Sequence, residues 1–220
     1  MEKPSTRSIE VRDLGLADYK EVWDLQLALV EERAAGKIPD TLLLVEHPHV
    51  YTCGRRTQEE NKPQAPVLGV PIYEIERGGD VTYHGPGQLV GYPIVHLTGR
   101  GLKIGDYIHL LEAALQETLL AFGVESHARE GREHTGVWVG PQDAPRKIAS
   151  IGLGVRHWVA FHGFALNANT DLAYFEAIRP CGFDPGMMTS MQRETGRLVD
   201  MSKLRRVARD RLLARLEKSR

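Results

Sequence analysis

The sequence predicts a soluble α+β protein in which helices flank a mixed β-sheet. Two patterns support this prediction: several short runs rich in apolar and β-branched residues, and a few segments with apolar residues at helical spacing that stand among those runs at irregular intervals. The composition agrees, because 42% of the 220 residues are hydrophobic and 26% are charged, as in ordinary globular domains. The irregular order argues against a regular alternation of strands and helices.

The first half of the chain begins with a short strand and a helix. Ile9 and Val11 alternate with polar neighbours, which is typical of a strand. Asp18 and Glu21 match a capping box, so a helix is expected to start there and to end at Gly36. The apolar run at 41–46 predicts a strand buried on both faces. Further strands are expected after Pro48 through Val50 and Tyr51, at 72–75 and at 88–97.

The second half holds the clearest helical pattern. Apolar side chains recur at steps of three or four from Ile104 to Phe122, and Gly123 follows. Strands are expected at 135–139, 147–155 and 158–166, a short helix at 171–178, and a helix from Asp200 whose apolar stripe ends at Leu216. We expect a single domain over residues 1–220. A boundary near Gly123, with a small C-terminal lobe from about residue 124, is the alternative.

Charge and cysteine content narrow the classes of function. The net charge is −1 and the pI is near 6.8, so no overall field draws the chain to nucleic acid or to a membrane surface. No stretch approaches the ~20 apolar residues of a membrane helix, and the N-terminus lacks the apolar core of a signal peptide. Two cysteines form no disulfide framework and suit a reducing compartment, so we expect a cytoplasmic protein.

The densest candidate for chemistry is the segment from Arg77 to Gln88, RGGDVTYHGPGQ. Its glycines allow backbone amides to approach a ligand closely, while Arg77 and His84 supply a cation and a titratable group. A glycine-rich hairpin is the alternative. The segment matches neither a P-loop nor a dinucleotide fingerprint, because the lysine of the first and the glycine order of the second are absent.

Lys147 and the two cysteines are the remaining candidates. Lys147 stands in an apolar, β-branched run, where a desolvated amine acts as a base; a lysine on an edge strand, facing water, is the alternative. Cys181 stands in a Pro-Cys-Gly loop and Cys53 precedes two arginines, so each is either a nucleophile or a small packed side chain. A metal site at His47, His49 and Cys53 is disfavoured, since no second Cys/His pair has zinc spacing. We expect no metal.

These segments together resemble the lipoyl(octanoyl) transferase family. The resemblance runs in order from about residue 41 to 190, through EHP, the YT and GRR that flank Cys53, the block at 77–88, KIASIG, HGFALN and PCG. It implies that Cys181 is the nucleophile and Lys147 its partner. The family commonly has an aliphatic residue at the position of Cys53, which favours a packing role for that thiol. The acyl pocket that the resemblance implies is lined by Arg77, Gly78, Gly79, Asp80, Val81, Thr82, Tyr83, His84, Ser150, Ile151, Gly152, Gly163, Phe164 and Ala165.

The resemblance also implies a reaction, its partners and a fold. An octanoyl or lipoyl group is expected to pass from octanoyl-acyl carrier protein to a lysine of a lipoyl domain through a cysteine thioester, with no cofactor. The expected acceptors are the lipoyl domains of 2-oxoacid dehydrogenase E2 subunits and the glycine cleavage H protein. The implied fold is that of biotin and lipoate protein ligases, with a smaller second sheet. An ATP-dependent lipoate or biotin ligase and a non-catalytic protein that binds acyl carriers or lipoyl domains are the alternatives.

Overall fold

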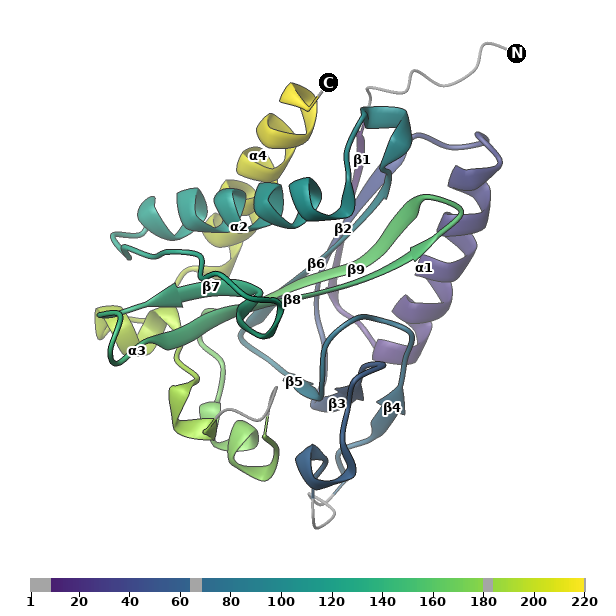
Figure 1. Cartoon of the computed structure of the whole chain (residues 1–220). Helices are drawn as coiled ribbons and strands as arrows, with labels where there is room; N and C mark the ends of the chain where they lie inside the picture. Colours follow the sequence, from purple (N-terminus) through teal and green to yellow (C-terminus); the bar gives the residue numbers. More distant parts are fainter. Residues whose placement is uncertain (1–8, 64–68, 180–183, 220) are drawn as a thin grey trace.

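The chain forms a six-stranded mixed sheet, a smaller three-stranded sheet and flanking helices, so the predicted α+β class is confirmed (Figure 1). The structure is a computed structural model, and it describes residues 9–63, 69–179 and 184–219. The large sheet has the strand order β1 (Ile9–Leu16), β2 (Asp40–Glu46), β6 (Gln88–His96), β9 (Val159–Asn167), β8 (Arg146–Arg156) and β7 (Gly136–Val139). The small sheet has the order β4 (Ile72–Glu74), β3 (Val50–Cys53) and β5 (Thr82–His84). The α-helices are α1 (Tyr19–Ala34), α2 (Ile104–Leu120), α3 (Met191–Thr195) and α4 (Met201–Lys218), and a 3-10 helix covers Leu172–Ala177.

The large sheet is buried between two helical layers. Helix α1 covers one face, and α2 with α4 covers the other (Figure 1). In β2, Leu43 and Val45 pack with the residues of α1, whereas Leu42 and Leu44 join the cluster formed with α2 and α4. This is why the strand is apolar at four consecutive positions, 42–45, rather than at every second one. Among the described residues, no helix combines the length and the apolar character needed to cross a bilayer.

The predicted helices and strands are found near the expected positions, with two differences: the short helix expected at 171–178 is a 3-10 helix over Leu172–Ala177, and the turn between β8 and β9 lies one residue later than expected. The strand predicted from residue 158 begins at Val159. His157 and Trp158 have φ angles of 52° and 61° and form the two-residue turn that precedes it. Two positive φ angles give such a turn the twist of a hairpin. The aromatic ring of Trp158 therefore belongs to an exposed turn and not to the sheet.

Strands from both halves of the chain share the large sheet. β1, β2 and β6 precede residue 124, β7 to β9 follow it, and α2 packs against α4. We propose on this basis that the chain is one domain and has no separate C-terminal lobe.

A buried ion cluster joins α1, the large sheet and α4. The fully buried Asp40 carboxylate accepts hydrogen bonds from Nε of Arg33 (2.6 Å), from Nε of Arg100, and from the N–H of His96 (3.0 Å). Arg100 also donates through Nη1 to the carbonyl oxygen of Leu216 in α4 (2.8 Å). The C-terminal helix is thus tied to the sheet through one carboxylate.

Asp40→Ala is expected to lower the free energy of unfolding by about 3–5 kcal/mol, because it leaves two buried guanidinium groups without their carboxylate. The matched control is Asp24→Ala on the surface of α1. It removes an exposed ion pair with Lys20 and should cost less than about 1 kcal/mol. Urea unfolding of both variants measures the difference. Equal losses would show that the cluster contributes no more than a surface pair.

Candidate active site

A pocket of about 890 Å³ lies where the start of α2, strands β8 and β9, and the segment 77–84 meet. Lys147 lines it, and so does every predicted lining residue except Tyr83. These are residues 77–82, His84, residues 150–152 and residues 163–165. The fold therefore brings three segments that are far apart in the sequence to one cavity.

Tyr83 does not line the pocket, which corrects the prediction for this residue. Side chains alternate in β5, so Thr82 and His84 border the pocket while Tyr83 faces the opposite side. There its buried ring stacks on that of Tyr174, with centroids 4.9 Å apart, and packs with Cys53. The prediction treated the motif as a continuous block and ignored the alternation of its strand.

Arg77 is buried beside glycines that leave room for its side chain. Its Nη2 donates to the carbonyl oxygen (2.7 Å) and to the hydroxyl oxygen (2.9 Å) of Thr52, and its Nη1 donates to the carbonyl of Gly78 (3.1 Å). A Cβ at Gly152 would lie 3.1 Å from Cδ of Arg77, and one at Gly54 would lie 2.8 Å from Nη1. These glycines thus allow a guanidinium to lie in the pocket wall.

Lys147 lies inside the large sheet and not on its edge. It is opposite Trp138 on β8, which runs between β7 and β9, and the residue is only 6% exposed. Its Nζ lies 5.1 Å from the centroid of the Trp138 ring. Its carbonyl oxygen accepts a hydrogen bond from the N–H of Thr189 (2.9 Å). The edge-strand alternative is therefore wrong, and the lysine belongs to the pocket wall.

Cys181 lies outside the described residues. Beyond that segment the chain reaches β8, where Met188 forms an isolated parallel bridge with Lys147. The role of Cys181 stays a prediction from the sequence.

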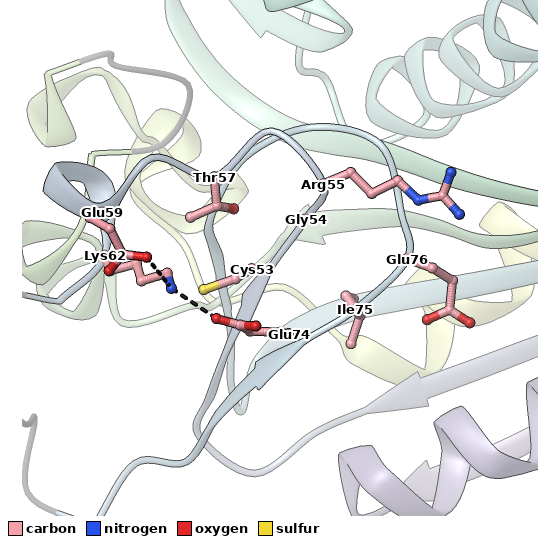
Figure 2. A pocket seen from close by; sticks show the side chains of 9 residues that line it. All are labelled: Cys53, Gly54, Arg55, Thr57, Glu59, Lys62, Glu74, Ile75 and Glu76. Atoms are coloured by element: carbon pink, nitrogen blue, oxygen red, sulfur yellow. Dashed lines mark hydrogen bonds and ion pairs between the residues drawn. The ribbon is translucent and has the colours of Figure 1, made fainter.

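Cys53 borders a second pocket, of about 530 Å³. The residue is 3% exposed, and burial raises the pKa of its thiol, which keeps the sulfur protonated at neutral pH. In Figure 2 the sulfur points toward Lys62, which forms ion pairs of 2.8 Å with Glu59 and Glu74. A buried, protonated thiol suits the packing role that the sequence favours.

Three buried histidines are neutral at physiological pH. Burial lowers the pKa of His47 to about 4 and those of His84 and His162 to about 3, and the charge of Arg77 contributes to the last two. His84 is held by a hydrogen bond between Nδ1 and Oε1 of Gln88 (2.8 Å). His162 lines the pocket, and among the described residues neither of its ring nitrogens has a hydrogen-bond partner. Its Nε2 lies 3.9 Å from Oε2 of Glu76.

The free energy of unfolding is expected to fall as the pH drops from about 6.5 toward 4, because the unfolded chain binds protons that these three histidines do not bind in the folded state. Each contributes a slope of up to about 1.4 kcal/mol per pH unit. His84→Gln should make the slope shallower, because it removes one of the three groups. Urea unfolding across this pH range is the measurement. A wild-type slope in His84→Gln would contradict the assignment.

Part of the pocket wall was not predicted from the sequence. The apolar side chains of α2 were expected in the core. Those near its start, Ile104 and Ile108, line the pocket instead, and Ile104 is 42% exposed. His162 has a φ of 55°, and its backbone N–H donates to Oε1 of Gln26 (2.9 Å). No sequence pattern indicates this local geometry. The other unpredicted lining residues are Tyr19, Arg56, Tyr92, Gly105, Ile108, His109, Glu112, residues 129–133, Thr135 and Leu153. Within the described ranges, no three His, Cys, Asp or Glu side chains are grouped to hold a metal ion.

Known proteins are similar to this chain in sequence, and others are similar in fold. A sequence model of the lipoyl protein ligase A/B catalytic domain matches residues 18–212. The chain belongs to this family. Among curated members of similar sequence, an octanoyltransferase from Syntrophotalea carbinolica is 47% identical over 197 residues, which cover 90% of this chain and 89% of that protein. An octanoyltransferase from Bacteroides fragilis (strain YCH46) is 44% identical over 217 residues, which cover 94% of this chain and 97% of that protein.

Solved structures of lipoyl protein ligase and biotin protein ligase type share this fold at low sequence identity. A putative lipoate protein ligase from T. acidophilum with bound lipoic acid superposes with a TM-score of 0.71 at 15% identity, covering 94% of this chain and 84% of that one. A biotin protein ligase from Aquifex aeolicus superposes with a TM-score of 0.55 at 12% identity, covering 96% of this chain and 70% of that one. The predicted ligase-type fold is confirmed.

Proposed function

We propose that this member of the lipoyl protein ligase A/B family is an octanoyltransferase, an enzyme that moves an octanoyl or lipoyl group from octanoyl-acyl carrier protein to a lysine of a lipoyl domain. The observation that carries the proposal is the single pocket shared by Lys147 and the segments at 77–84, 150–152 and 163–165. The choice of an octanoyl group as the acyl group is supported by the names of the similar curated proteins, which are octanoyltransferases. The proposed acceptors are the lipoyl domains of 2-oxoacid dehydrogenase E2 subunits and the glycine cleavage H protein. The proposed compartment is the cytoplasm, since a nucleophilic thiol needs reducing surroundings.

In the proposed first half-reaction, Cys181 attacks the thioester carbonyl of the donor. Neutral Lys147 accepts the thiol proton, the new C–S bond forms, and the bond to the carrier sulfur breaks. The carrier thiolate then takes the proton from the Lys147 ammonium. Exchange between two thioesters keeps the acyl group activated. The ring of Trp138, 5.1 Å from Nζ, stabilises the ammonium while it exists.

In the proposed second half-reaction, the amine of the acceptor lysine attacks the Cys181 thioester and forms an amide. Lys147 accepts a proton from the incoming amino group, and Cys181 leaves as a thiolate that is then protonated to the thiol. One base thus serves both halves of the reaction.

The acyl chain is proposed to lie along the apolar part of the pocket wall. Ile108 of α2, Ile151 and Leu153 of β8, and Phe164 of β9 supply that surface. Each methylene buried there contributes about 0.8 kcal/mol of binding free energy. Contact with this wall is the proposed basis of chain selectivity.

The test is transfer without nucleotide. Purified protein is mixed with octanoyl-acyl carrier protein and a lipoyl domain, and intact masses are measured. The expected result is a lipoyl domain that gains one octanoyl group, with an octanoyl group on Cys181 of the enzyme at early times. Strict dependence on ATP and Mg²⁺ would assign a ligase instead. Binding of the carrier or the lipoyl domain without turnover in either condition would assign a non-catalytic protein.

A further inference from the structure

Glu112 is a buried carboxylate in the wall of the pocket. It comes from the middle of α2, and its side chain is 5% exposed. Oε1 accepts a hydrogen bond from the N–H of Gly136 (3.1 Å), and Oε2 contacts Nδ1 of His109 (3.0 Å). Within the described part of the chain these are its hydrogen-bond partners. His109 is 78% exposed and carries a charge only when protonated. A buried carboxylate is costly unless a cation balances it.

Gly136 connects Glu112 with Lys147. Its N–H binds the carboxylate, and a Cβ on the same residue would lie only 2.9 Å from Cε of Lys147. Both side chains line the same pocket. The carboxylate and the proposed base are therefore both neighbours of Gly136 in the pocket wall.

The acceptor of the proposed reaction is itself a lysine. Its amine has a pKa of about 10.4 in water, so it arrives as an ammonium ion. It must enter a pocket whose wall already contains the guanidinium of Arg77. Like charges repel at this range, and a buried carboxylate offsets that repulsion. The thioester of the donor carries no such positive charge.

We propose that Glu112 binds the ammonium group of the acceptor lysine and positions it beside Lys147. This inference rests on the proposed function and assigns the carboxylate to acceptor recognition. The bound ammonium gives one proton to neutral Lys147, and the resulting amine attacks the carbonyl carbon of the Cys181 thioester. The C–N bond forms, the C–S bond breaks, and the second amine proton goes to the Cys181 thiolate. Lys147 returns its proton to water before the next cycle.

The test separates the two half-reactions in Glu112→Gln. The glutamine keeps an oxygen for the Gly136 N–H and removes only the charge. Loading of the enzyme from octanoyl-acyl carrier protein is expected to stay within about twofold of the wild type. Transfer from the isolated octanoyl-enzyme to a lipoyl domain is expected to slow by roughly 10- to 100-fold, the size of a lost charge-assisted contact. Transfer to hydroxylamine, which is uncharged at neutral pH, should be unaffected.

Each other outcome overturns the inference. If Glu112 has only a structural role, Glu112→Gln will slow loading and transfer together. If Glu112 assists the chemistry with any acceptor, the variant will slow transfer to hydroxylamine as much as transfer to the lipoyl domain. Wild-type transfer to the lipoyl domain would show that the charge is not used. Glu117→Gln is the matched control, because it removes a charge from the same helix where Glu117 pairs with Arg215 outside the pocket. If the wild-type enzyme itself forms no octanoyl adduct, the proposed function fails and not this inference alone.

Discussion

Cys181→Ala is expected to abolish octanoyl transfer and to leave no octanoyl group on the enzyme. Without the sulfur, the acyl group has no covalent site on the protein, and the donor thioester must meet the acceptor amine directly. Intact mass of the variant after exposure to octanoyl-acyl carrier protein is the measurement. An adduct on Cys181→Ala would place the nucleophile elsewhere.

Cys53→Ala is the matched control for that variant. Its thiol is buried among the side chains of the small sheet, and burial raises its pKa, so the reactive thiolate is disfavoured. We expect wild-type transfer, with a loss of stability of about 0.5–3 kcal/mol from the lost packing. If the two variants exchanged phenotypes, both assignments would be wrong.

Lys147→Met is expected to slow transfer by about 10²–10⁴-fold, the usual contribution of a general acid or base. Methionine keeps an unbranched side chain to pack on Trp138 but has no group that accepts or returns a proton. Single-turnover rates for both half-reactions, followed by intact mass, measure the effect.

Lys203→Met is the control for this substitution. Lys203 also lies over an aromatic ring, with Nζ 5.2 Å from the centroid of Phe122, but it is an exposed residue of α4 and lies outside the pocket. It should transfer at the wild-type rate. A loss in Lys147→Met below tenfold would remove Lys147 from the proton transfers.

The helices and strands follow from patterns that act over a few residues. The spacing from Ile104 to Phe122 and the apolar run of β2 predict their elements because each needs only its own period and its own burial. The wall of the pocket depends on which elements meet. Tyr92 lies in an apolar strand and Glu112 in an amphipathic helix, and nothing local marks either residue as part of a cavity.

The lining residues that were predicted share one property: they lie in segments where glycine and polar residues interrupt the apolar pattern. The glycines beside Arg77 can be recognised in the sequence, because only a residue without a side chain permits the close approach of the arginine. Tyr83 shows that a motif does not identify every lining residue correctly, since this motif contains residues of both faces of β5. The family resemblance therefore identified the glycine-rich wall of the pocket and missed the parts built by α1, α2, β6 and the segment 129–135.

The close contact between Gly152 and Arg77 decides where the substrate range of the enzyme can be altered. Any larger residue at Gly152 meets the arginine side chain and the Gly78 carbonyl, at 3.1 Å and 2.9 Å, so substitution there displaces a guanidinium before it shortens the cavity. Ile104 and Ile108 present side chains to the pocket from the first turns of a helix, so we expect a change in their size to alter the cavity without moving the backbone. Libraries aimed at longer or branched acyl donors belong at these two positions.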